Sequence, residues 1–189
     1  MDRDKIEQGF RLVMEGLGLD MSEPHLRDSP RRTAEAWTEE LCAGLKEPPV
    51  AVQRYPLEEG QHAGMILLRD IPVKSVCAHH LLPFVGQASV GYIPEQSFCG
   101  LSDLSRVVAH FARRPQLQEL LTDQVARALF EAIAPRGLGV VVQASHSCME
   151  LRGVNHSGLV TTRTLLGSFL TDPADRAEFL ALTRPGAAG

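Results

Sequence analysis

Several features are missing from this 189-residue sequence, and each absence argues against a class of protein. There is no excess of basic residues, because 19 lysines and arginines stand against 23 aspartates and glutamates, giving a formal charge of −4. Nucleic-acid binding generally requires a positively charged surface, so we expect no nucleic-acid partner. The N-terminus, residues 1–5, is charged and leads into no uninterrupted apolar run, so we expect neither a secretory signal nor a membrane span, and we predict a cytoplasmic protein.

Cysteine is scarce, and two common sequence patterns are absent. The four cysteines are Cys42, Cys77, Cys99 and Cys148. In a cytoplasmic chain they are better interpreted as thiols or metal ligands than as disulfides. Cys42 and Cys99 have apolar neighbours, which predicts buried structural thiols. No G-x-G-x-x-G segment follows a strand and no repeat occurs, so neither a Rossmann domain nor a repeat array is expected.

The sequence does contain alternating helical and strand patterns. Apolar spacing predicts helices over residues 6–17, 30–43, 102–111, 116–132 and 172–182, with Ser102 as one helix cap. Short apolar runs predict strands over residues 65–68, 71–76, 85–93, 138–144, 149–154 and 160–169. This order indicates an α+β fold in which helices cover one face of a mainly antiparallel sheet. Prolines at 48 and 49 separate an N-terminal helical arm, 1–48, from the main domain, 49–189.

One short turn carries the strongest chemical signal. Cys77 and His80 are separated by two residues, a spacing that lets a tight turn present sulfur and nitrogen to one tetrahedral ion. Cys148 could supply a third ligand from a distant segment. Three protein ligands leave a coordination position for water, as in catalytic zinc sites. A C-x-x-H pair also occurs by chance, but the neighbouring His79 and His146 favour a metal site.

Five segments together resemble the motif set of the GTP cyclohydrolase I family. They are Cys-Ala-His-His-Leu-Leu-Pro-Phe at 77–84, Gly-Tyr-Ile-Pro at 91–94, Gly-Leu-Ser at 100–102, Phe-Ala-Arg-Arg-Pro-Gln-Leu-Gln-Glu at 111–119 and His-Ser-Cys-Met-Glu-Leu-Arg-Gly-Val at 146–154. The similarity extends over residues 23–182. It implies the tunnelling fold and a symmetric homo-oligomer, typically a decamer of two stacked pentamers, with active sites between subunits.

The resemblance also implies a reaction. GTP is hydrolysed at C8, formate leaves, and the ribose rearranges to give 7,8-dihydroneopterin triphosphate. Zn²⁺ held by Cys77, His80 and Cys148 would lower the pKa of the attacking water. His146 would protonate the purine at N7 as a catalytic residue, and His79 would act near the ribose hydroxyls.

By the same resemblance, Gln118 and Glu119 recognise guanine. A carboxylate suits guanine because it can accept hydrogen bonds from both N1–H and the exocyclic amine. Arginine suits phosphate oxygens because its donors form a rigid fork. The residues that correspond to ribose or triphosphate contacts are Ser102, Arg106, Arg152 and Arg32.

Two positions depart from the family pattern, because Asp103 and Glu35 stand where phosphate-facing lysines are usual. A unit charge pair ~4 Å apart at an effective dielectric of ~20 is worth about 4 kcal/mol, so each substitution predicts repulsion of phosphate. The substrate could then be a guanine nucleotide with fewer phosphates, or guanosine. Two further alternatives are a reaction that stops at the ring-opened formamidopyrimidine and a non-enzymatic, zinc-containing pterin- or purine-binding oligomer. Retention of His79 and His146 argues against a simple binder.

Overall fold

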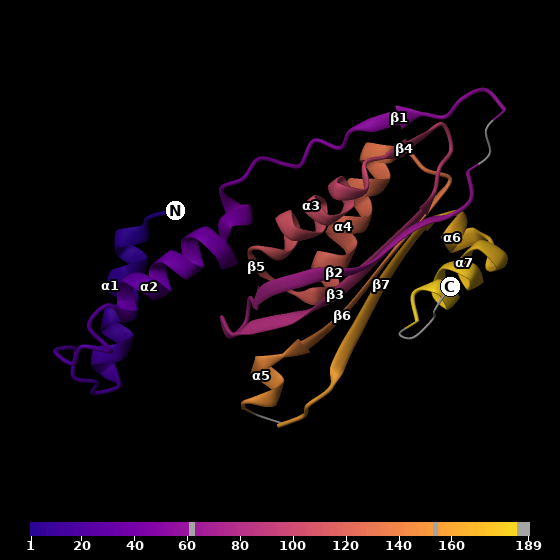
Figure 1. Ribbon diagram of the computed structural model, residues 1–189. Helices are drawn as coiled ribbons and strands as arrows, with labels where there is room; N and C mark the ends of the chain where they lie inside the picture. The colour runs from indigo at the N-terminus through magenta and orange to yellow at the C-terminus, as the bar shows by residue number, and fades with distance from the viewer. Residues whose placement is uncertain (61–62, 153–154, 185–189) are drawn as a thin grey trace.

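The computed structural model describes residues 1–60, 63–152 and 155–184, and it is built around one five-stranded sheet (Figure 1). The strands are β2 (Ile66–Cys77), β3 (Pro83–Ile93), β5 (Pro115–Gln116), β6 (Gly137–His146) and β7 (Leu159–Gly167). They lie in the order β5-β2-β3-β6-β7, and every pair is antiparallel except β2 with β5. A second, two-stranded sheet pairs β1 (Arg54–Pro56) with β4 (Ser97–Cys99). The predicted α+β class is confirmed.

The main core lies between the sheet and two helices, α3 (Leu101–Ala112) and α4 (Gln118–Ile133). Side chains in a strand alternate between the two faces of the sheet. On β6, Leu138, Val140 and Val142 point to the α3 and α4 face, and each is at most 1% exposed. This long apolar strand therefore fixes the position of both helices.

The opposite face of the sheet is also partly covered, so the prediction that helices occupy one face is wrong. The short helix α6 (Ser168–Thr171) and α7 (Pro173–Leu182) form a second apolar cluster with Val141. Their contact depends on Gly91 and Gly139, which face each other on β3 and β6. A Cβ on Gly139 would lie 2.5 Å from the Phe179 ring, so only glycine leaves room for that ring.

Strand β2 leads to the turn that contains Cys77 and His80, called the metal turn below. This strand is continuous, although the sequence predicted two strands. Its pairing with β3 shifts between Leu68 and Ile71, where an irregularity of the β-bulge kind interrupts the register. Asp70 lies there with a φ of 57°, a left-handed conformation that aspartate tolerates better than most residues. The polar Arg69-Asp70 pair therefore bends the strand without ending it.

The N-terminal helices lie beside the sheet, at the left of Figure 1. Helix α1 (Arg3–Gly16) matches its prediction, whereas the predicted second helix divides into α2 (Ser29–Glu35), the π-helical turn η1 (Ala36–Leu41) and the 3₁₀ turn η2 (Ala43–Leu45). The Thr38 hydroxyl donates to the Ala34 carbonyl at 2.9 Å. A threonine that bonds back in this way disturbs a regular helix.

Three other local predictions need correction. Helix α3 begins at Leu101 with Gly100 at its cap, so Ser102 is not the capping residue. The apolar spacing within residues 116–132 predicts Leu120 on the inner face of that helix, but Leu120 is 51% exposed. The predicted strand over 149–154 is replaced by the one-turn helix α5 (Ser147–Glu150), while residues 153–154 lie outside the described residues.

Other predictions are confirmed. Helix α7 begins as expected, because the Asp172 side chain accepts a hydrogen bond from the Ala174 N–H at 2.8 Å. Cys42 and Cys99 are free, buried thiols. Among the described helices, none combines the length and the apolar character needed to cross a membrane.

Candidate active site

The metal turn connects β2 to β3. The Cys77 N–H donates to the Leu82 carbonyl at 2.8 Å, and the Leu81 N–H donates to the Cys77 carbonyl at 2.8 Å. Leu81 has a φ of 55°, which lets the chain reverse within a few residues. The closed turn holds Cys77 at the end of a buried strand and leaves His80 exposed beside it.

The three predicted ligands converge. Cys77, His80 and Cys148 offer ligand atoms that all lie within 4.8 Å of one another, and Cys77 Sγ is 4.0 Å from His80 Nδ1. Cys148 reaches the turn because α5 follows directly after β6. No other such group was found in the part of the chain that the structure describes.

The chemistry of this donor set fits a metal ion. Burial raises the pKa of the Cys148 thiol, and the neighbouring Cys77 thiol raises it further. Two adjacent thiols cannot both ionise easily unless a cation offsets their charges. Two sulfurs and one imidazole nitrogen are typical ligands of zinc, although the same donors also bind other soft divalent ions. The residues therefore support a metal site.

His146 is held in one orientation by its neighbours. Its ring stacks on Phe84 with centroids 4.6 Å apart, and its Nε2 lies 2.7 Å from Gln118 Oε1. Since Oε1 is an acceptor, Nε2 must carry the proton, which leaves Nδ1 free of it in the neutral ring. Burial lowers the pKa of His146, while the carboxylates of Glu119 and Glu150 act in the opposite direction.

Gln118, which the family resemblance assigns to guanine recognition, has a buried and fully hydrogen-bonded side chain in this chain. Its side chain is 1% exposed, and Nε2 donates to the carbonyls of Val142 at 3.1 Å and Val160 at 2.9 Å. Nε2 also lies 3.2 Å from the Thr162 hydroxyl. Both ends of the carboxamide are thus used within the protein. This geometry favours a role in positioning His146 over a side-chain contact with guanine.

A cavity of about 300 Å³ brings the predicted chemical groups together. Its lining includes the three metal ligands, the ring of His79, the ring of His146 and the exposed side chain of Glu119. Glu119 forms no ion pair with any described residue, so its carboxylate remains available to a ligand. Arg152 is exposed just beyond α5 and its charge acts on Cys148, but it does not line this cavity.

Three other predicted residues do not line this cavity. Ser102 and Arg106 lie in the first half of α3, near β1, where the Gly100 N–H donates to the Gln53 carbonyl at 3.3 Å. The metal site lies near the other end of α3, where β5 pairs with the end of β2. A helix of this length spans roughly 18 Å. Arg32 lies on α2 and is 3.8 Å from Asp28.

The two acidic departures are both paired with arginines. Asp103 is 3% exposed and contacts Arg106, and Glu35 contacts Arg3 and Arg31. Each carboxylate charge is therefore offset within the chain. The predicted repulsion of phosphate is consequently much weaker than two unpaired carboxylates would produce.

Sequence reasoning missed the residues that hold His146. Phe84 follows the metal turn, and its proximity to His146 depends on the register in which β3 pairs with β6. Thr162 lies on β7, where its hydroxyl is 2.6 Å from that of Thr122. No local sequence pattern marks either contact, because each joins segments that are distant along the chain.

An α+β protein with three converging metal ligands, two flanking histidines and an unpaired carboxylate in one cavity belongs to the class of metal-dependent enzymes. The GTP cyclohydrolase I family model matches residues 6–184. A GTP cyclohydrolase 1 of Carboxydothermus hydrogenoformans is 48% identical over 185 residues, which cover 96% of this chain and 95% of that one. The chain belongs to the GTP cyclohydrolase I family.

Other comparisons agree in sequence and are weak in structure. A GTP cyclohydrolase 1 of Halalkalibacterium halodurans is 44% identical, with 97% of this chain and 98% of that one covered. Among solved structures, an archaeosine synthase QueF-Like is similar with a TM-score of 0.45 and 18% identity, over 55% of this chain and 96% of that one. That likeness is too low to define the fold.

Proposed function

We propose that this protein is a zinc-dependent GTP cyclohydrolase I. It hydrolyses GTP at C8, releases formate and forms 7,8-dihydroneopterin triphosphate. The observation that carries the proposal is the convergence of Cys77, His80 and Cys148 in the cavity that also contains His146 and Glu119. Family membership over nearly the whole chain supports the same reaction.

Glu119 and the metal ligands define how guanine would bind. The Glu119 carboxylate can accept hydrogen bonds from N1–H and from the exocyclic amine, a donor pair that adenine lacks. This contact would direct the imidazole ring of the purine towards the metal ligands. Zn²⁺ held by Cys77, His80 and Cys148 would supply Lewis-acid activation of the water that attacks C8.

His146 would move protons at the purine. Gln118 Oε1 accepts a hydrogen bond from the His146 Nε2–H, so Nδ1 is the nitrogen that can exchange a proton with N7. The carbonyls of Val142 and Val160 hold Gln118 in place, which prevents the imidazole from turning. His79, which lines the same cavity, would exchange protons with the ribose hydroxyls.

We also propose that the complete site forms between copies of the chain. Ser102 and Arg106 would bind the ribose and triphosphate of GTP that lies in the cavity of a second copy, with Arg32 and Arg152 as further cations. Their separation from the cavity of their own chain supports this arrangement. The same proposal includes the tunnelling fold and a decamer. It also divides the chain into an arm, 1–48, and a catalytic domain, 49–189.

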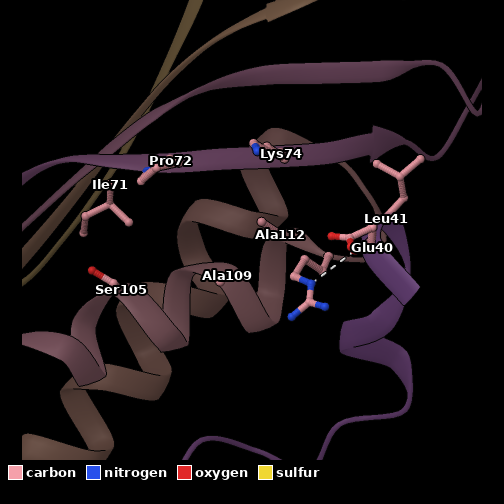
Figure 2. A pocket seen from close by; sticks show the side chains of 9 residues that line it. Glu40, Leu41, Ile71, Pro72, Lys74, Ser105, Ala109 and Ala112 are labelled. Carbon is pink, nitrogen blue, oxygen red and sulfur yellow. Dashed lines mark hydrogen bonds between the residues drawn. The ribbon is translucent and has the colours of Figure 1, made fainter. Parts of the chain in front are cut away.

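An open sheet edge supports the oligomer. In the described chain, β2 has no strand partner on its outer side before Val76, and β7 pairs only with β6. A cavity of about 300 Å³ lies beside that edge. Figure 2 shows its lining, with Ile71 and Pro72 on β2 and Ala109 and Ala112 on α3. A strand from a second copy would pair with the edge and cover this mostly apolar cavity.

The test is formate release from GTP by the purified, zinc-loaded protein. We expect formate and a product that fluoresces after oxidation, because only a closed pterin ring fluoresces. His146→Ala should reduce the rate by about 10²- to 10⁴-fold with zinc content unchanged. Cys148→Ser should lose both zinc and activity, whereas Cys42→Ser, a buried thiol away from the site, should keep both. Formate without a pterin would instead support the ring-opened product.

A further inference from the structure

Asp103 in the first turn of α3 is a buried carboxylate with both oxygens occupied. It is 3% exposed, and Oδ2 accepts a hydrogen bond from the Gln53 N–H at 2.8 Å. Oδ1 accepts a hydrogen bond from Nη2 of Arg106. A buried carboxylate is stable only when its charge and lone pairs are satisfied in this way. Asp103 therefore has a defined structural environment rather than a solvent-facing charge.

Arg106 is held by this carboxylate but remains accessible. Its side chain is 60% exposed, compared with 4% for the Asp103 side chain. Among the described residues, its hydrogen bond and its ion pair are both with Asp103, through one terminal nitrogen. A guanidinium has five N–H donors, so most of them are left for a ligand. The pair lies one helical turn apart, where such contacts form readily.

Asp103 is itself fixed from two directions. The backbone of Gln53, fifty residues earlier in the chain, donates to Asp103, and the Gly100 N–H donates to the Gln53 carbonyl at 3.3 Å. The start of α3 is thus joined to the segment before β1. A carboxylate anchored by a backbone N–H can orient the arginine that it contacts.

We propose that Asp103 is a positioning residue, which holds the Arg106 guanidinium ready for the triphosphate of GTP bound to a second copy. This inference rests on the proposed function. An arginine that is already ordered loses less side-chain freedom when it binds phosphate, so binding is tighter. The Asp103 oxygens face Gln53 and Arg106. Asp103 therefore orders the Arg106 side chain, whereas the lysine that is usual at this position would add a positive charge.

Asp103→Asn tests the proposal because asparagine can still accept from the Gln53 N–H but lacks the charge that holds Arg106. We expect the KM for GTP to rise about 5- to 10-fold with kcat changed less than about 2-fold. In an Arg106→Ala background the same substitution should change KM less than about 2-fold, since its effect passes through Arg106. The matched control is Asp123→Asn on α4, where Asp123 contacts Arg127 at 2.7 Å, and it should leave KM unchanged.

The outcomes separate this inference from the proposed function. If the wild-type protein releases formate from GTP but Asp103→Asn lowers KM, Asp103 repels phosphate and the inference is wrong. An equal effect in both backgrounds would also overturn it, because a purely structural role does not need Arg106. If the wild type releases no formate, the proposed function fails, and calorimetric titration of GTP into the same variants decides the inference: weaker binding by Asp103→Asn supports it, and unchanged or tighter binding overturns it.

Discussion

The two ends of helix α3 differ in how many candidate site residues a single chain brings together. Beyond its C-terminal end, one chain brings together three metal ligands, two histidines and a carboxylate in a single cavity. At its N-terminal end, Ser102 and Arg106 are exposed, and they line neither of the two cavities described above. The difference indicates that the chemistry is organised within a chain, whereas we propose that phosphate binding depends on assembly.

The strongest test of this comparison is to mix two variants, each of which is impaired at one end of α3. Arg106→Ala chains keep the metal end, and Cys148→Ser chains keep the phosphate end. If the site is shared, unfolding and reassembling an equal mixture should restore activity in about one quarter of the sites. Neither variant reassembled alone should recover activity. No gain above the separate variants would mean that each chain forms its whole site.

The metal end can be weakened without removing a ligand. Gln118→Met keeps the side-chain volume but removes the hydrogen bond that orients His146. Loss of such a supporting contact typically costs about 10- to 100-fold, and we expect this fall in kcat with zinc content unchanged. Gln143→Met is the control, because the Gln143 carboxamide donates to the Thr161 hydroxyl at 3.2 Å and does not line the cavity that contains His146. A KM effect with normal kcat would instead indicate that Gln118 contacts guanine.

Substitutions on the sheet face that packs against α6 and α7 should change the stability of the protein without changing the function of either end of α3. Gly139→Ala would place a methyl group 2.5 Å from the Phe179 ring, and overpacking of this kind costs about 1–3 kcal/mol. We expect a lower midpoint of urea denaturation with zinc binding retained. Gly9→Ala has no atom within 4 Å of the added carbon and should not destabilise the protein. Equal midpoints for the two variants would contradict the close packing of Phe179.

A smaller, pH-dependent effect is expected at His110, near the C-terminal end of α3. Burial lowers its pKa, the Arg114 charge lowers it further, and Glu47 acts in the opposite direction. The folded protein therefore binds the proton less tightly than the unfolded chain, whose histidine pKa is about 6.5. The stability contributed by neutral His110 is present above that pH and is lost as the pH falls below it.

Thermal denaturation at several pH values measures this effect. Between about pH 8 and about pH 5, the Tm of the wild type should fall more than that of His110→Gln, which cannot titrate. His25 is exposed, so His25→Gln should follow the wild type. A His110→Gln curve parallel to the wild type would show that His110 does not contribute to the acid sensitivity.

The sequence predicted which three side chains converge at the candidate metal site, because two of them lie in one short turn. Cys77 and His80 share one turn, and Cys148 follows a strand whose apolar pattern is plain. The positions of the Gln118 and Asp103 side chains could not be predicted in this way. Each is decided by contacts with distant segments, with Val142 and Val160 in one case and Gln53 in the other.

The same limit applies to the fold. The α+β class and most elements follow from apolar spacing, and the cap of α7 follows from Asp172. The second covered face could not be predicted, because it depends on two glycines meeting across β3 and β6 beneath a phenylalanine. Polar residues interrupt the apolar pattern both at a β-bulge and at the end of a strand. The bulge at Asp70 was therefore predicted as a strand end.

The proline at the open edge of β2 has a consequence for newly made chains. Pro72 has no N–H, and it lies within β2 beside the cavity of Figure 2. Because this edge lacks one N–H donor, it is a poor template for strands of other chains. A partner strand that has no acceptor opposite Pro72 loses no hydrogen bond there. The β2 edge of a single chain is thereby less prone to aggregation by strand pairing.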